Sequence, residues 1–359
     1  MFFEQISAKF ILFFMFYGGT TLAALIASIY LCLRKSNAFA DGITSSVRLR
    51  RWAAAFFAIV FVCHIWWLLF YIYSGEKYSV SCVLFAVLDS VSLLTTIPGM
   101  LFAMLQDRKR PVWPVVLTTI PYAVLGALHL FYPNGYFIDI AIAYMLLVYV
   151  FFTLYMIYAV RQYGQWLRDN YADLEHKEVW VSHVLVIVVL ILIIIDGFES
   201  DDITISSLVQ FVEFAFIGFL LWRIETLPQL ENPPVEQQPQ QSLAIPSNIE
   251  QLLNERCVGS QLYLQHDLSL LQLAQAIGTN RYYLSQYFSR QGITYNAYIN
   301  NLRINHFMSL YRQAIATRHP ITAQQLASDS GYRSYSTFGL AFKQRMGQSV
   351  TAWMRKTSN

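Results

Sequence analysis

The strongest restriction on the fold is a series of long apolar runs in the first two thirds of the chain. A stretch of about 20 predominantly apolar residues can cross a hydrocarbon core of about 30 Å as a helix. Hydrophobic residues make up 56% of the chain and charged residues 13%, against about 45–50% and 25% in soluble domains. These features exclude a compact soluble enzyme and a disordered chain, and they predict an all-α membrane bundle of seven helices. The seven runs are 10–33, 52–73, 78–105, 112–131, 137–160, 179–198 and 203–222.

Charge divides the chain into three parts. Residues 1–223 carry 14 Lys and Arg against 15 Asp and Glu, residues 224–247 carry none against 3, and residues 248–359 carry 11 against 4. The middle part also holds five prolines and five glutamines without apolar periodicity, which is typical of an extended linker. We therefore expect a sensor domain of seven transmembrane helices at 1–223, a Pro/Gln-rich linker at 224–247 and a basic domain at 248–359.

The distribution of Lys and Arg between the predicted loops indicates how the bundle is oriented. Twelve of these residues lie in 34–51, 106–111 and 161–178 and at Arg223, all on one side of the predicted bundle. The other side has only Lys9 and Lys77. Because basic loops stay in the cytoplasm, the N-terminus is expected outside the cell and the C-terminal domain in the cytoplasm.

Several ionisable residues interrupt the apolar runs. Asp89 and Glu213 lie near the middle of the third and seventh runs, Asp196 lies near the outer end of the sixth, and His64 lies in the second. Such groups are costly inside a bilayer and often mark functional sites, so these four are candidates for perceiving a signal. The alternative is that they are neutral or hydrogen-bonded and only hold the bundle together. Both interpretations stay open at this level.

The basic C-terminal part has apolar residues at helical spacing in place of long apolar runs. Residues 270–277 predict one amphipathic helix and residues 283–288 predict a second. Between them, Gly278 permits the positive φ of a tight turn, and Thr279 or Asn280 can cap the helix that follows. Ala274 is small enough for two helices to cross closely, and Leu284 is placed to seal the crossing. This spacing is typical of a helix-turn-helix.

The same pattern occurs a second time, which makes it far more specific. Leu326-Ala327 repeats Leu273-Ala274 at an offset of 53 residues, and Gly331 repeats Gly278 at the same offset. Further matches follow at offsets of 54 and 55 residues, with Gly347 corresponding to Gly292. The sequence therefore predicts two helix-turn-helix units joined by a long helix over residues 296–315.

This duplicated arrangement resembles the DNA-binding domain of AraC/XylS-type transcription regulators. The resemblance covers about 100 of the last 112 residues and none of the first 247, and it implies a bacterial regulator located in the plasma membrane. Val350, Met354 and Phe307 depart from the residues usual in that family. The text that carries the resemblance is LSLLQLAQAIGTNRYYLSQYFSRQGITYNAYINNLRI followed by ITAQQLASDSGYRSYSTFGLAFKQRMGQSVTAWM.

Electrostatics and helix geometry select the candidate DNA contacts. A net charge of +7 on 112 residues is typical of a protein that binds duplex DNA. Side chains on the exposed face of the second helix of each unit can reach base edges in the major groove. Each residue taken singly is equally compatible with a solvated helix face. The candidate base-reading residues are Arg281, Tyr282, Ser285, Gln286, Arg333, Tyr335, Ser336 and Gly339. The candidate phosphate contacts are Arg290, Arg303, Lys343 and Arg345.

Together these features favour a membrane-embedded, sequence-specific DNA-binding transcription regulator in which the bundle perceives a signal. The expected partners are double-stranded DNA, membrane lipid, a small-molecule or membrane-borne signal and a second copy of the chain. Proteolytic release at the linker is a variant of this mechanism. The alternative is a small-solute transporter or channel with a regulatory cytoplasmic domain. No enzyme motif such as HExxH, GxSxG or a phosphate loop occurs, and we expect no catalysis, metal or cofactor.

Overall fold

The computed structural model describes residues 8–73, 80–132, 135–198, 203–230, 248–317 and 321–358, with the backbone alone at 71, 73, 80–82, 193–198 and 358. Every regular element in these ranges is a helix, so the expected all-α class is confirmed for them. The chain divides into two units. The first comprises Met1–Tyr163 and Val179–Asn232, and the second comprises Gly164–Glu178 and Pro233–Asn359.

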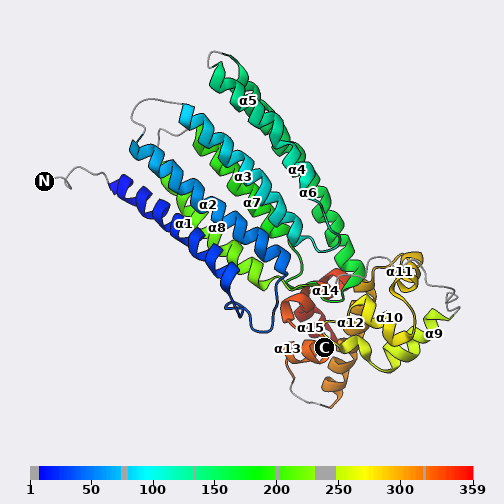
Figure 1. Ribbon diagram of the computed structural model, residues 1–359. Helices are drawn as coiled ribbons and strands as arrows, with labels where there is room; N and C mark the ends of the chain where they lie inside the picture. The colour runs from blue at the N-terminus through cyan, green and yellow to red at the C-terminus, as the bar shows by residue number, and fades with distance from the viewer. Residues whose placement is uncertain are drawn as a thin grey trace. The chain divides into compact units, whose positions relative to one another are not determined.

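The first unit is built from long helices that run side by side (Figure 1). Helix α1 packs against α2 and α8, α2 packs against α3, and α7 packs against α8. Helix α6 begins in this unit, and its residues after Tyr163 belong to the second unit. The helices are α1 (Ala8–Leu33), α2 (Val47–Tyr73), α3 (Val80–Met104), α4 (Trp113–Leu117), α5 (Thr119–Phe131), α6 (Phe137–Asn170), α7 (Trp180–Phe198) and α8 (Ile203–Thr226).

Six helical segments among the described residues are long and apolar enough to cross a membrane. They correspond to six of the seven runs expected from the sequence, with α4 and α5 together forming one of them. The remaining run, 179–198, coincides with α7, of which Trp180–Leu192 is described in full as a shorter apolar helix. A bundle of apolar helices is therefore present, and a seventh span stays a prediction.

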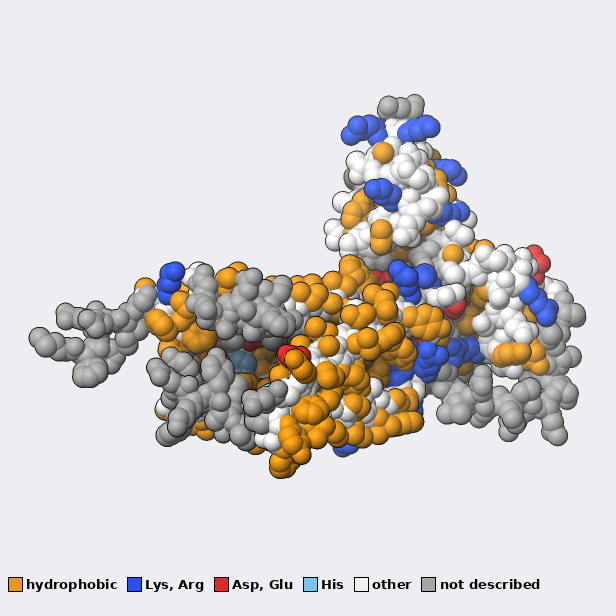
Figure 2. Space-filling view, turned by 90° about the horizontal axis from the view of Figure 1, so that it is seen from above, with side chains coloured by type: hydrophobic (Ala, Val, Ile, Leu, Met, Phe, Trp, Pro, Cys, Tyr) orange, Lys and Arg blue, Asp and Glu red, His pale blue; other side chains and the backbone are white. Residues whose placement is uncertain are grey.

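The outer surface of this bundle is apolar. Phe131 is 79% exposed and Leu22 is 57% exposed, although both have large hydrocarbon side chains. In the space-filling view, hydrophobic side chains cover most of the visible surface of these helices (Figure 2). A continuous apolar surface of this kind is costly in water and suits a lipid environment.

One end of the bundle is closed by buried polar contacts that reach into the expected linker. Arg34 forms an ion pair of 3.1 Å with Glu225, whose side chain is fully buried. Beyond the end of α8, the Gln229 backbone N–H donates to the Thr44 carbonyl oxygen at 2.8 Å, and Leu227 is also fully buried. Residues 224–230, expected at the start of the linker, therefore pack as part of the first unit. The rest of the expected linker, 231–247, lies outside the described residues.

The second unit holds a set of shorter helices around two cores that share one long helix, α12 (Tyr295–Ala316). Tyr295 and Ile299 of α12 belong to the first core, with α10 and α11. Phe307 and Tyr311, further along α12, belong to the second core, with α13, α14 and α15. The other helices are α9 (Ile249–Leu253), η1 (Asn254–Gly259), η2 (Leu262–Leu264), α10 (Leu270–Ile277), α11 (Arg281–Arg290), α13 (Ala323–Asp329), α14 (Tyr335–Met346) and α15 (Val350–Ser358).

The sequence repeat corresponds to a repeat of local structure. Ser269 and Thr322 cap α10 and α13, each accepting a backbone N–H bond from the residue three positions on. The two turn glycines, Gly278 and Gly331, have φ of +79° and +88°, a conformation that costs side-chain-bearing residues about 1–2 kcal/mol. At Gly331 an added Cβ would also lie 2.7 Å from the Leu264 carbonyl oxygen. Each half therefore builds the same capped helix pair.

Candidate nucleic-acid interface and intramembrane polar cluster

Helix α11 presents the first set of candidate base-reading residues. Its N-cap, Asn280, accepts a hydrogen bond from the Tyr283 backbone N–H at 2.9 Å, which fixes where the helix begins. Buried Leu284 anchors one face of α11 in the first core. The opposite face carries Tyr282, which is 62% exposed and accepts a 2.6 Å hydrogen bond from the Gln286 amide. Ser285 is also exposed, so three of the four candidates share this face.

Arg281, the fourth candidate, is half-buried at the first position of α11. Its Nε donates to the Asn170 side-chain oxygen at 2.8 Å. Burial lowers the pKa of the Arg281 guanidinium from its ordinary value, and the neighbouring Tyr171 opposes that shift. The group nevertheless stays charged at neutral pH, because an arginine starts far above it.

Helix α14 presents the second set. Ser334 caps it by accepting the Thr337 backbone N–H at 3.3 Å. Tyr335 and Ser336 are exposed, and Gly339 lies half-buried on the same side of the helix. Arg333, just before the helix, is exposed and paired with Asp267 at 2.6 Å. Thus Tyr335, Ser336 and Gly339 share one side of α14, and Arg333 lies just before its first turn.

The sequence-based choice omitted Leu340, which is 62% exposed on α14. Its position four residues after Ser336 places it on the same face of α14 as that residue. An exposed leucine on a groove-facing helix is chemically suited to contact a thymine methyl group. The helical period was the signal that could have found it, but an apolar residue was not considered as a base contact.

The candidate phosphate contacts separate into exposed and buried residues. Arg290 and Lys343 are exposed at the surface of α11 and α14. Arg345 is exposed as well, and its guanidinium donates to the Asn301 carbonyl oxygen at 2.6 Å and to the Asn305 side chain at 2.8 Å. These three placements are compatible with phosphate contacts.

Arg303 requires a correction, because it is only 1% exposed. Its guanidinium donates to the backbone carbonyl oxygens of Tyr263 at 2.7 Å and Gln265 at 2.6 Å, with a longer bond of 3.2 Å to His266. The charged group also lies over the Tyr332 ring at 5.5 Å. Since α12 contributes to both cores, Arg303 joins the two halves from inside and cannot reach a phosphate.

Two of the intramembrane candidates lie together in the first unit, on α2 and α8. His64 Nε2 is 3.6 Å from a Glu213 carboxylate oxygen and 3.4 Å from the Gln210 side-chain oxygen. The Gln210 amide donates to Glu213 at 3.0 Å, and the Tyr17 hydroxyl donates to the His64 carbonyl oxygen at 2.6 Å. The side chains of His64 and Glu213 are 12% and 15% exposed. We call Tyr17, His64, Gln210 and Glu213 the intramembrane polar cluster.

Asp89 lies on α3, where its carboxylate accepts a hydrogen bond from the Trp67 indole N–H of α2. Because Trp67 and His64 are both on α2, one helix links Asp89 to the intramembrane polar cluster. The side chain of Asp196, the remaining candidate, lies outside the described residues. Within the described residues, no three His, Cys, Asp or Glu side chains gather closely enough to hold a metal ion.

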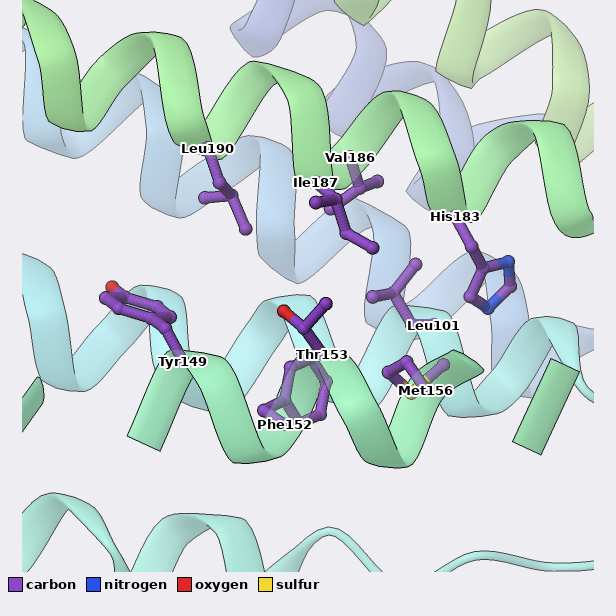
Figure 3. Close-up of a pocket in the computed structure, with 9 residues that line it drawn as sticks. All are labelled: Leu101, Tyr149, Phe152, Thr153, Met156, His183, Val186, Ile187 and Leu190. Atoms are coloured by element: carbon purple, nitrogen blue, oxygen red, sulfur yellow. The ribbon is translucent and has the colours of Figure 1, made fainter. Parts of the chain in front are cut away.

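A small apolar cleft lies between α6 and α7, with Leu101 of α3 on its side (Figure 3). His183 is at one end of the cleft, 3% exposed, with its Nδ1 2.8 Å from the Val179 carbonyl oxygen. The remaining lining is apolar apart from the hydroxyl groups of Tyr149 and Thr153. The cleft is therefore distinct in chemistry from the intramembrane polar cluster.

The second unit contains capped helix pairs, and the first unit contains long apolar helices. Together they define a class of protein in which a DNA-binding domain is combined with a membrane segment. In a comparison with protein families, a helix-turn-helix domain matched residues 273–356. No curated protein and no solved structure matched the chain. The C-terminal part is therefore a helix-turn-helix domain, which supports a DNA-binding transcription regulator, and the rest of the chain has helices apolar enough for several membrane crossings.

Proposed function

We propose that this protein is a membrane-embedded, sequence-specific transcription regulator in which the transmembrane bundle perceives a signal and the C-terminal domain binds duplex DNA. The observation that carries the proposal is the helix-turn-helix match at residues 273–356 on a chain that also has six apolar helices of spanning length. A DNA-binding domain must face the compartment that contains DNA. In this proposal the C-terminus is cytoplasmic, and the distribution of basic residues between the loops supports an N-terminus outside the cell.

Both helix pairs act as DNA-reading units in this proposal. Support comes from their matching caps and turn glycines, which present α11 and α14 in the same local frame. Arg281, Gln286 and their neighbours on α11 read one stretch of the major groove, and Arg333, Ser336 and Leu340 read another. Arg290, Lys343 and Arg345 contact phosphates. Because each pair reads only a few bases, a preferred site contains two short blocks on one face of the duplex.

The test is selection from a random duplex library by the full-length protein in lipid nanodiscs. Wild-type protein is expected to enrich a bipartite sequence. Gln286→Ala, on the reading helix α11, should flatten the preference within one block, with a loss of about 1–3 kcal/mol of discrimination at the affected base. Gln275→Ala removes the same amide from an exposed position on α10 and should leave the preference unchanged. If none of these proteins enriches any sequence, sequence-specific binding is refuted.

We further propose that the intramembrane polar cluster is where the signal acts on the bundle. Glu213 lies ten residues from the start of α8, or about 15 Å along the helix from its outer end in the proposed orientation. The cluster joins α1, α2 and α8 through hydrogen bonds and a 3.6 Å contact between the His64 ring and the Glu213 carboxylate. A change in protonation, hydration or ligation there alters the contacts between three packed helices, which is the differential interaction that a switch requires.

Footprinting of the full-length protein on chromosomal DNA tests this role. Glu213→Gln keeps the shape of the side chain, removes its charge and is expected to change occupancy without changing which sequences are occupied. Asp139→Asn is the matched control, because Asp139 is an exposed acid in the first turn of α6. Equal occupancy for wild type and Glu213→Gln under every growth condition would show that the cluster only supports packing.

A location in a bacterial plasma membrane, association into a homodimer and release by cleavage of the linker extend the proposal. They rest on the resemblance to AraC/XylS-type regulators and on the Pro/Gln-rich composition of 224–247. The transporter or channel alternative finds no support in the comparisons, and we do not propose it.

A further inference from the structure

The second unit contains a segment from the membrane half of the sequence, Gly164–Glu178, which comprises the last residues of α6 and the connection to α7. We call it the α6–α7 segment. Its Ala172 is 3% exposed and belongs to the first core of the helix-turn-helix domain, together with residues of α10 and α11. Asn170, Asp173 and Lys177 are buried as well, at 7%, 5% and 7% exposure. Three polar residues buried together in a connecting segment indicate a specific docked conformation.

Backbone and side-chain bonds fix the segment in register with the domain. Tyr171 forms an antiparallel bridge with Ser269, the N-cap of α10, and the Ala172 N–H donates to the Leu268 carbonyl oxygen at 3.3 Å. The Asn296 amide, in the first turn of α12, donates to the Ala172 carbonyl oxygen at 2.7 Å. The segment is therefore bound through backbone groups that a disordered loop would leave in water.

The same segment engages both proposed reading helices at their N-terminal turns. On α11, Arg281 donates to Asn170 at 2.8 Å. On α14, the Thr337 hydroxyl donates to a Glu175 carboxylate oxygen at 3.0 Å. Asp267 lies between Arg333, at 2.6 Å, and Lys177 of the segment, at 3.6 Å. In helix-turn-helix proteins the N-terminal residues of the second helix are the ones that contact bases, so the segment and a DNA groove compete for Arg281 and Thr337.

The charge of the α6–α7 segment is complementary to that of the DNA-binding domain, which also favours competition with DNA. The α6–α7 segment carries four acidic and two basic residues, while residues 248–359 carry a net charge of +7. Glu175 places a carboxylate at the N-terminal turn of α14, where a negative group is favourable and where a DNA phosphate would also be favourable. The segment thus offers the domain the same kind of group that DNA offers.

From this geometry we propose that the α6–α7 segment is an autoinhibitory latch, which holds the reading helices in a state that binds DNA weakly and is released when the bundle responds to its signal. The proposal rests on the proposed DNA-binding function and adds its regulation. Release frees Arg281 and Thr337 together, because both contacts run through one segment. Coupling to the bundle is covalent, since α6 and α7 enter the segment from either side.

The test uses full-length protein in nanodiscs and a labelled duplex obtained by selection from a random library with the same protein. Asn170→Ala and Glu175→Ala each remove one latch contact without touching the DNA-binding domain. Each is expected to tighten binding about tenfold, and the double variant more. Gln165→Ala is a control that removes an amide at an exposed position of the same segment, and it should change affinity less than threefold.

A disulfide provides a second, independent measurement. Residues paired in an antiparallel bridge have Cα atoms about 4.5–5.5 Å apart, within the range that a disulfide spans. Tyr171→Cys with Ser269→Cys should therefore form a bond on oxidation, and the oxidised protein should lose affinity at least tenfold and regain it on reduction. Each single cysteine variant, oxidised in parallel, controls for loss of the Ser269 cap.

The outcomes separate the latch from the function on which it rests. Tighter binding by the latch variants and weaker binding by the oxidised pair support it. Unchanged or weaker binding by the latch variants, or unaltered binding by the oxidised pair, overturns it while leaving DNA binding in place. If no form of the protein enriches any duplex, the proposed function fails and the latch fails with it.

Discussion

Replacing Arg303 by methionine removes the charge that ties the two halves of the DNA-binding domain together while keeping a long side chain. The guanidinium supplies three hydrogen bonds to backbone carbonyl oxygens and is 1% exposed. A hydrogen bond to a charged group contributes about 1.5–3 kcal/mol, and each carbonyl oxygen left buried without a donor costs about 1–3 kcal/mol. Removing the burial cost of the charge offsets several kcal/mol of that loss. The net destabilisation is therefore about 3–5 kcal/mol.

Hydrogen exchange of the full-length protein, read by mass spectrometry, measures this loss in place. A destabilisation of about 3–5 kcal/mol lowers the protection of the α12 amides by a factor between about a hundred and a few thousand. Arg290→Met is the matched control, because Arg290 is exposed at the end of α11, and it should lower protection less than about fivefold.

A change of less than fivefold for Arg303→Met would refute the reasoning, because it would mean that water or another donor satisfies the three carbonyl oxygens. The same experiment decides between a structural role and a phosphate contact. A phosphate-contacting arginine changes the salt dependence of DNA binding and leaves amide protection almost unchanged. For Arg303 we expect the opposite behaviour.

Three further measurements check other parts of the structure. Gly331→Ala should destabilise α13 and α14 by at least about 1 kcal/mol more than Gly278→Ala destabilises α10 and α11, as measured by hydrogen exchange. Both glycines have positive φ, but their surroundings differ. A Cβ at Gly331 would meet the Leu264 carbonyl oxygen at 2.7 Å, whereas one at Gly278 would meet only the end of the Arg256 side chain at 3.5 Å. Lys343→Ala should reduce the slope of log affinity against log salt by about 0.9, and an unchanged slope would remove Lys343 from the phosphate contacts. Burial raises the pKa of Cys257 to about 11, so its thiol stays protonated up to about pH 10. The thiol should therefore resist iodoacetamide at pH 8 until the protein is denatured, as followed by mass spectrometry. Rapid labelling of the native protein would contradict the buried position.

The helices that position the functional groups could be predicted wherever a local pattern specifies them. Apolar runs predicted the long helices of the first unit, because crossing a hydrocarbon layer requires a minimum length of apolar residues. Gly278 predicted the turn, and either Thr279 or Asn280 was expected to cap the helix that follows; the structure has Asn280 as the cap. The positive φ and the N-cap are properties of single residues. The end of α6 was missed: the run stops at Arg161, but the helix continues to Asn170, because polar residues can extend a helix beyond the apolar layer.

The positions of Arg303 and of the α6–α7 segment could not be predicted in this way. Arg303 looks like any basic residue on an amphipathic helix, and only the packing of α12 between two cores shows that it points inward. The contact between Asn170 and Arg281 joins residues 111 positions apart, and no helical period or repeat relates them. Local spacing specifies elements, whereas such pairings depend on how distant elements pack.

The energy of the proposed latch is suited to a switch driven from within the bundle. A latch that weakens DNA binding tenfold requires only about 1.4 kcal/mol to open, and the signal must supply at least that difference between the closed and open states. Loss or formation of one interhelical contact in a membrane contributes about 0.6–2 kcal/mol. A change at the His64–Glu213 pair, which are 3.6 Å apart on α2 and α8, is therefore sufficient in magnitude. If Glu213→Gln changes DNA occupancy in wild-type protein but has no effect once Asn170 and Glu175 are both replaced by alanine, the intramembrane polar cluster acts through the latch. Equal effects of Glu213→Gln in both backgrounds would show that the intramembrane polar cluster acts independently of the latch.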